Sequence, residues 1–254
     1  MSIWRKKFFA FGLHFLATAM LGAIAAALIF FVWFPSPFAT MIGGTELFML
    51  VVGCDLVLGP LLTLVIYNPS KKRRELIFDY SVVGTVQIAM MVYGVYIVAG
   101  TRPVAVAFNH DRLEVVTARD ISAAELAAAR LPEYGSLPLT GPRYVAIQVP
   151  AADQQDALFQ SLQGNEEHQR PKFYAPYAAG LEEIHKRTQG IDVLEKKFPD
   201  QAPALDAAVR EAGVAPGTAR WLPVHHRRGF WTVIVDPASG RPLSYATVDP
   251  YGGS

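Results

Sequence analysis

Histidine and aspartate are the residue types in this chain that could do acid–base or metal chemistry, but their spacing argues against both. His225 and His226 are adjacent, and neighbouring strand residues point to opposite faces, so the pair cannot readily chelate one metal ion. An intramembrane aspartyl protease needs two deep aspartates, whereas Asp55 is deep in an apolar stretch and Asp79 lies at a membrane boundary. The sequence also lacks a G-x-S-x-G elbow, a phosphate loop and a dinucleotide fingerprint. We therefore expect no enzyme activity, no metal site and no cofactor.

Asp55 is the ionisable residue in the most unusual setting. It lies within VVGCDLVLGPLLT, residues 51–63, and an ionised carboxylate at the centre of a membrane costs at least ~2.5 kcal/mol. Gln87 lies at nearly the same depth when each apolar stretch is centred in the membrane, whereas His14 lies roughly ten Å toward the cytoplasm by the helical rise. We therefore expect Asp55 to face protein and favour Gln87 as its partner.

Three roles remain open for Asp55: a structural hydrogen bond between helices, a contact with a partner's transmembrane helix, and catalysis. The residues around it favour close helix packing. Gly53, Gly59 and Gly84 allow helices to approach closely. Pro60 removes one backbone hydrogen bond and is expected to kink its helix.

Three apolar stretches must position these residues. The chain has 254 residues, of which 52% are hydrophobic and 18% charged, and its mean hydropathy is +0.24. No lysine or arginine occurs between Phe8 and Ser70. We expect a membrane domain over residues 1–100 with transmembrane helices at about 8–34, 46–67 and 78–99. A cleaved signal peptide is the alternative for the first stretch, but its apolar region is far longer than the about 7 to 15 residues that such a peptide uses.

Basic residues flank these stretches on one side. Lysines and arginines occur before the first stretch and between the second and third, at Arg5, Lys6, Lys7, Lys71, Lys72, Arg73 and Arg74. The positive-inside bias then predicts a cytoplasmic N-terminus. Three crossings place residues 101–254 on the other side, which is the periplasm if the protein is in a bacterial inner membrane.

Residues 101–254 have the patterning of a soluble α+β domain with terminal β-hairpins. The predicted strands include a first hairpin at 103–109 and 112–118, a third strand at 143–150 centred on 144–149, and a final meander whose last hairpin turns at 237–240. Ser122 and Glu125 form a capping box for one helix, and Asp153 is expected to cap another that ends near Gln163. Helical composition also occurs at 177–188 and about 199–212.

The charge and the number of spans argue against two further classes of protein, nucleic-acid binders and transporters. A net charge of +1 gives no reason to expect nucleic-acid binding. Three spans with one deep ionisable residue offer neither the inverted repeat nor the polar pathway of a transporter. Cys54 is the single cysteine, so no intrachain disulfide can form. A membrane-anchored binding protein fits best, and a membrane-anchored periplasmic sensor or envelope-modifying enzyme is the alternative.

Several motifs recur here in an order that resembles the TfpX/TfpZ family of type IV pilin accessory proteins. The resemblance is dense over roughly residues 30–121 and loose afterward. It is carried by WFPSPF (33–38), GGTELFMLVVGCDLVLGPLLTLVIYNPSKK (43–72), YGVYIVAGTRPV (93–104), FNHDRLEVVTARDI (108–121) and the closing VDPASGRPLSYATVDPY.

The resemblance implies an inner-membrane protein that helps its cognate pilin to reach the surface as a fibre and acts as a pilin-specific chaperone. Its implied partners are a type IV pilin, other pilus-assembly membrane proteins and membrane lipid. The family offers no catalytic residues to carry over. Its characteristic positions fall on Asp55, Gly59, Pro60, Arg102, Asp111 and Arg112. Together with Gln87, these are the candidate partner-binding residues, and we expect the three-helix bundle to receive the hydrophobic helix of the pilin.

Overall fold

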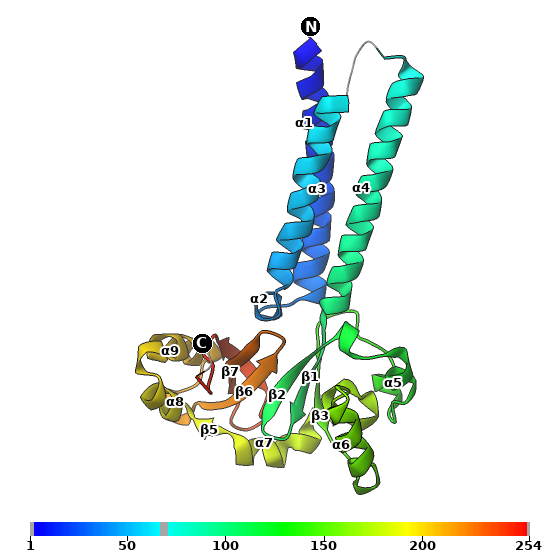
Figure 1. Ribbon diagram of the computed structural model, residues 1–254. Helices are drawn as coiled ribbons and strands as arrows, with labels where there is room; N and C mark the ends of the chain where they lie inside the picture. The colour runs from blue at the N-terminus through cyan, green and yellow to red at the C-terminus, as the bar shows by residue number, and fades with distance from the viewer. Residues whose placement is uncertain (1–2, 67–70, 253–254) are drawn as a thin grey trace. The chain divides into compact units, whose positions relative to one another are not determined.

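The computed structural model describes residues 3–66 and 71–252, and the chain forms two compact units, residues 1–102 and 103–254. The first unit is built from three long helices, and the second from a mixed sheet with short helices (Figure 1). The expected fold class, three membrane helices followed by a soluble α+β domain with C-terminal strands, is confirmed.

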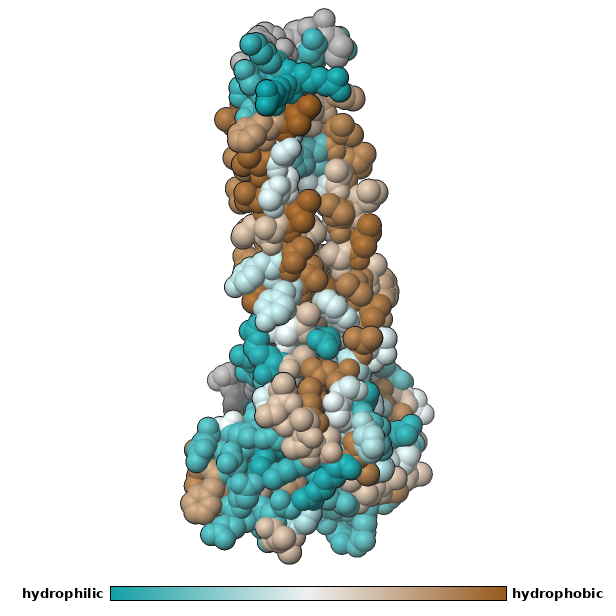
Figure 2. All heavy atoms as spheres, turned by 90° about the vertical axis from the view of Figure 1, so that its right-hand side faces the viewer, coloured by the Kyte–Doolittle hydropathy of each residue, from teal (hydrophilic) through white to brown (hydrophobic). Residues whose placement is uncertain are grey.

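The three long helices are long and apolar enough to cross a membrane. They are α1, Ile3–Ala27, which continues as a π-helical turn over Leu28–Trp33, α3, Gly44–Ile66, and α4, Arg73–Thr101. Hydrophobic residues cover the helices over most of the face seen in Figure 2. A short helix, α2, Phe38–Met41, lies in the link where no element was expected. Tyr67, the last residue of the expected second span, lies outside the described residues.

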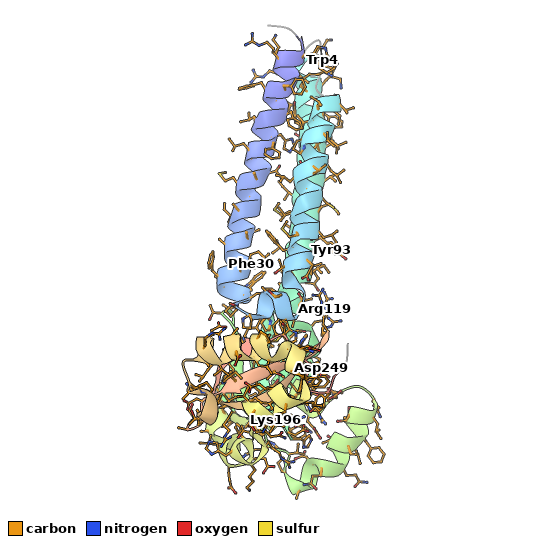
Figure 3. The ribbon with its side chains drawn as sticks, turned by 90° about the vertical axis from the view of Figure 1, so that its left-hand side faces the viewer. Trp4, Phe30, Tyr93, Arg119, Lys196 and Asp249 are labelled. Atoms are coloured by element: carbon orange, nitrogen blue, oxygen red, sulfur yellow. The ribbon has the colours of Figure 1, made fainter. Side chains whose placement is uncertain are left out.

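Helix α3 packs against both α1 and α4. Near Phe30 of the π-helical turn, labelled in Figure 3, an apolar cluster formed by Ile29, Phe34, Phe48 and Val98 joins this turn to α3 and α4. Ala25 and Ala26 of α1 pack against the cluster. The rings of Phe30 and Phe48 meet edge to face with centroids 5.1 Å apart, a favourable aromatic geometry. Gly94 lets α4 approach α3, because a Cβ there would lie 2.4 Å from a methyl carbon of Val51.

The soluble unit is organised around one mixed sheet. The strand order is β4-β3-β1-β2-β6-β7-β8, with β5 paired to β6. Strands β1 and β3 are parallel, as are β2 and β6, and the remaining neighbours are antiparallel. The bounds are β1 Pro103–Asn109, β2 Arg112–Thr117, β3 Arg143–Ile147, β4 Tyr174–Pro176, β5 Gln189–Gly190, β6 Arg220–His226, β7 Gly229–Val235 and β8 Pro242–Ala246.

Short helices cover this sheet and complete its cores. They are α5 Ala123–Ala127, α6 Gln154–Leu162, α7 Leu181–Arg187, α8 Ile191–Lys197 and α9 Ala202–Ala212. Helices α8 and α9 bury Leu194, Leu205 and Val209 against Trp221 and Ile234 of the sheet. A second core forms around β1 and β3 and includes the edge-to-face rings of Tyr134 and Tyr174. These apolar contacts hold the soluble unit together without a disulfide.

Local signals predicted some of these elements well and others poorly. The first hairpin forms as expected, and the Ser122 hydroxyl accepts a hydrogen bond of 3.2 Å from the Glu125 backbone N–H. Asp153 does not cap α6 with its side chain, because its carboxylate is bound by Arg130 and Lys172. Helix α8 and strand β4 were not expected.

Candidate functional site

Three helices meet at a polar network inside the membrane unit. The His14 ring of α1 lies between Thr63 of α3 and Gln87 of α4: its Nδ1 is 2.5 Å from the Thr63 hydroxyl, and its Nε2 is 2.6 Å from the Gln87 Oε1. The Gln87 amide nitrogen donates to the backbone carbonyl of Asp55 at 3.5 Å. Each long helix therefore contributes a side chain to one continuous chain of hydrogen bonds.

This network is complete without a charge. Because the Gln87 carbonyl oxygen can only accept, the His14 Nε2 carries the proton and donates to it. In the neutral ring, Nδ1 then accepts from the Thr63 hydroxyl. Polar side chains that satisfy one another in this way can hold helices together in a medium without water.

The Asp55 carboxylate stands outside this network. Asp55 is 9% exposed, and its Oδ2 has no hydrogen-bond partner among the described residues. The expected pairing with Gln87 is therefore corrected: Gln87 reaches the backbone of Asp55, and its own side-chain oxygen is bound by His14. Because His14 bonds Gln87, which also reaches the Asp55 backbone, the expected difference in depth between His14 and these two residues is wrong.

Gly59 and Pro60 shape the part of α3 that faces Gln87. A Cβ at Gly59 would lie 1.8 Å from the Gln87 Nε2, so the amide occupies the space that a side chain would fill. Pro60 is buried, and α3 continues through it to Ile66. Of the predicted site residues, Asp55, Gly59 and Gln87 are thus brought together. His14 and Thr63 were missed, although a histidine in an uncharged span is itself a signal of function or pairing.

A groove of about 460 Å³ opens between α1 and α4, with Asp55 of α3 among its lining residues. His14 and Gln87 also line it, and its walls are Ala17, Thr18 and Leu21 of α1 and Gly84, Ile88 and Met91 of α4. The exposed side chains of Leu21 and Ile88 leave the groove open toward the lipid. Its walls are mostly apolar and partly small, which suits packing against an apolar helix.

The candidate residues of the soluble unit form a separate cluster. Arg112 Nε lies 2.9 Å from the Asp111 carboxylate and 3.8 Å from that of Glu114. Glu114 in turn bonds His225 Nδ1 at 2.7 Å, and the Arg112 guanidinium lies over the Phe230 ring at 5.6 Å. Asp111 and Arg112 were predicted, whereas Glu114 and His225 were not, because strands β2 and β6 are distant in sequence.

The adjacent histidines lie in opposite environments, as the strand geometry predicts. The hydrogen bond that His225 donates to the Glu114 carboxylate raises the pKa of His225, whereas burial lowers the pKa of His226 to about 4. Within residues 3–66 and 71–252, no group of three or more His, Cys, Asp or Glu side chains could hold a metal ion.

Arg102 belongs to the membrane unit and ends α4. Its guanidinium donates to the carbonyl oxygen of Ala99 at 2.7 Å. A cation at this position interacts favourably with the exposed carbonyls and the dipole of the helix C-terminus. Arg102 is therefore bound locally, and the soluble-unit pair Asp111 and Arg112 belongs to a different unit.

Comparison with known proteins places these features in a family. Residues 2–43 match the family Fimbrial assembly protein FimB. The chain is 34% identical over 229 residues, 89% of each chain, to "Fimbrial assembly protein, serogroup I" of Dichelobacter nodosus. The chain belongs to the fimbrial assembly protein family. A serogroup E1 relative is 33% identical over 229 residues, again 89% of each chain, and a relative of serogroups C1 and C2 is 41% identical over 118 residues, 46% of this chain and 90% of the relative, both from the same organism. No solved structure matches the chain.

Membership of the fimbrial assembly protein family connects the chain to fimbrial assembly. The two matches that cover 89% of the chain extend over both units, so the membrane helices and the soluble unit are shared with relatives of similar length. The family match at residues 2–43 covers α1 and reaches the link that follows it, including His14 and the α1 wall of the groove.

Proposed function

We propose that this protein is a non-catalytic accessory protein, of the type that the TfpX/TfpZ resemblance implies, which assists type IV pilus assembly by binding its cognate pilin as a chaperone. The observation that carries the proposal is the groove between α1 and α4, whose mostly apolar walls meet the Asp55 side chain. A groove of this kind suits one more transmembrane helix. The names of the relatives support a role in fimbrial assembly, and the pilin is the subunit with which that assembly works.

The proposed location is a bacterial inner membrane with the N-terminus in the cytoplasm. The basic residues before α1 and at the start of α4 support this orientation, because positively charged flanks remain on the cytoplasmic side. The soluble unit then lies in the periplasm, where it can contact the head of the pilin while the groove holds the pilin helix. In this orientation, both units can act on one partner.

Photocrosslinking in cells tests the proposal. A photoreactive amino acid is placed at Ala17 or Ile88, which line the groove, and at Leu16 or Val86, which are exposed neighbours outside it. We expect a pilin adduct from the groove positions and a much weaker one from the outward positions. Recovery of no pilin from either groove position, with the protein present in the membrane, would contradict the proposal.

A further inference from the structure

We infer that the helix held in the groove carries a hydrogen-bond donor at the depth of Asp55, and that this donor is what the groove recognises. The inference rests on the proposed function in one respect, that a partner's helix occupies the groove. It adds the chemistry of the recognised group. A helix that is apolar throughout is therefore expected to bind the groove more weakly.

The other polar side chains of the network near Asp55 already have hydrogen-bond partners. Both nitrogens of His14, the hydroxyl of Thr63 and both ends of the Gln87 amide are engaged. Among the described residues of the membrane unit, two buried side-chain atoms lack a partner: the Oδ2 of Asp55, which lines the groove, and the Nε of Arg102, which follows α4 and is not a groove residue. Leaving a buried polar group without a partner is unfavourable, because the group loses its bonds to water and gains none in return.

The hydrogen bond that the Oδ2 of Asp55 lacks requires a donor that the network does not supply. The donors of His14 and Gln87 are committed to acceptors of the network. The hydroxyl of Thr18, which also lines the groove, makes no hydrogen bond to the Oδ2 of Asp55. A lipid acyl chain fills apolar space but carries no donor at this depth. A carboxyl group keeps an acceptor oxygen whether it is ionised or protonated, so a donor from a partner fits either form. The requirement therefore points to a polar group from outside the chain.

The membrane also restricts which kind of polypeptide can occupy the groove. A polypeptide that brings a donor to the middle of a membrane must satisfy its own backbone, and a helix does so internally. The groove lies between α1 and α4 and has room for the side chains of a further helix, because a Cβ at Gly84 would meet no atom within 4 Å. Small side chains at Ala17 and Gly84 permit the close approach that brings a short donor side chain to Asp55.

Designed transmembrane peptides test this chemistry directly. The full chain is placed in phosphatidylcholine vesicles with a labelled polyleucine helix that carries a single central serine, or alanine in the matched peptide. Association is followed by energy transfer. We expect the serine peptide to bind the wild-type protein about threefold to tenfold more tightly than the alanine peptide, the range expected for one interhelical hydrogen bond.

Variants at Asp55 assign the preference to its side chain. Asp55→Asn retains an acceptor oxygen and should keep most of the serine preference, whereas Asp55→Leu should remove it. Thr85→Leu, at an exposed position of α4 outside the groove lining, is the matched control and should leave the preference intact. Circular dichroism confirms that each variant keeps its helical content.

Each outcome bears on the inference. Equal binding of the two peptides to the wild type, or an unchanged serine preference in Asp55→Leu, would overturn it. Asp55-dependent self-association that excludes both peptides would also overturn it, because the donor would then come from a second copy of this chain. A serine preference without a pilin crosslink would refute the pilin as the occupant and leave the donor requirement standing. A pilin crosslink without a serine preference would refute the donor requirement and leave the pilin as the occupant.

Discussion

Asp55 in the helix bundle and Arg112 in the first hairpin of the soluble unit are both ionisable residues that lie among other side chains. They differ in how many hydrogen-bond and ion-pair partners the chain itself provides. Arg112 has Asp111 and Glu114 as ion-pair partners and the ring of Phe230 beneath it. The Oδ2 of Asp55 has no hydrogen bond among the described residues. Water can complete the first arrangement, whereas lipid cannot complete the second. A polar atom without a hydrogen bond therefore points to a partner more strongly in the helix bundle than in the soluble unit.

The largest effect is expected from Asp55→Leu. The leucine removes the acceptor but suits the lipid and the apolar walls, so the protein should insert and fold while surface fibre yield falls at least about tenfold, the loss expected when the partner's polar group is left unpaired. Asp55→Asn should retain much of the yield. Val57→Leu, at an exposed position two residues along α3, is the control. Equal fibre yields from the leucine and asparagine variants would remove Asp55 as a partner site.

The next effect concerns the pH response of the soluble unit. His226 is 3% exposed and its pKa is lowered by burial to about 4. Because the folded pKa lies below the unfolded value, the stabilisation is present above about pH 6.5 and is lost as the pH falls toward 4. Between pH 7 and pH 4.5 the loss in unfolding free energy is about 2–3 kcal/mol, since one unit of pKa shift corresponds to about 1.4 kcal/mol.

His226→Phe should remove this part of the pH dependence. Unfolding of the full chain in micelles at pH 7 and pH 4.5, followed by tryptophan fluorescence, measures it, since the Trp231 ring lies 5.6 Å from that of His226. The difference in unfolding free energy between the two pH values should be smaller in the variant. An identical difference in both proteins would show that other groups control the acid response.

Gly59→Ala tests the tight packing around Gln87. The added Cβ would lie 1.8 Å from the Gln87 Nε2, so the polar network must shift, at a cost of about 1–3 kcal/mol. Gly53→Ala is the matched control on the same helix: its Cβ meets nothing within 4 Å, and it should be neutral or slightly stabilising. Titration with sodium dodecyl sulfate, followed by circular dichroism, compares the two. Equal stability of both variants would contradict the structure around Gln87.

The smallest effect is expected at the pair of Glu114 and His225. Glu114 raises the pKa of His225, so its stabilisation is fully present below about pH 6.5 and is lost as the pH rises through the raised pKa. The His225 side chain is 42% exposed, so solvent screening limits the contribution to less than about 1 kcal/mol. Glu114→Gln should lower the His225 pKa toward its ordinary value in an NMR titration. An unchanged midpoint would show that Glu114 does not set it.

Patterns that are local in sequence predicted much of the fold. The apolar stretches gave the three membrane helices, and alternation around Asn109 to Asp111 gave the first hairpin. Contacts between distant segments could not be read in this way. The bond between His14 and Gln87 spans 73 residues and depends on how the helices are staggered, and that between Glu114 and His225 spans 111 residues and depends on the parallel pairing of β2 and β6.

In the candidate site, too, local signals were predictable and contacts between distant residues were not. Asp55 could be singled out because a carboxylate in an apolar stretch is costly wherever the helix packs. Its hydrogen-bond partner could not be predicted in this way. Depth in the membrane favoured Gln87, but the side-chain oxygen of Gln87 accepts from His14 instead. Asp153 failed as a cap for a related reason, because Arg130 and Lys172 compete for its carboxylate.

Disulfide trapping between the groove and the pilin helix tests the central claim most directly. Ile88→Cys is made in a Cys54→Ala background and paired in cells with single cysteines along the transmembrane helix of the pilin. The account predicts crosslinks at pilin positions three to four residues apart, one face of a helix, and their loss in Asp55→Leu. Uniform or absent crosslinks, or the same pattern from the outward-facing Val86→Cys, would contradict it.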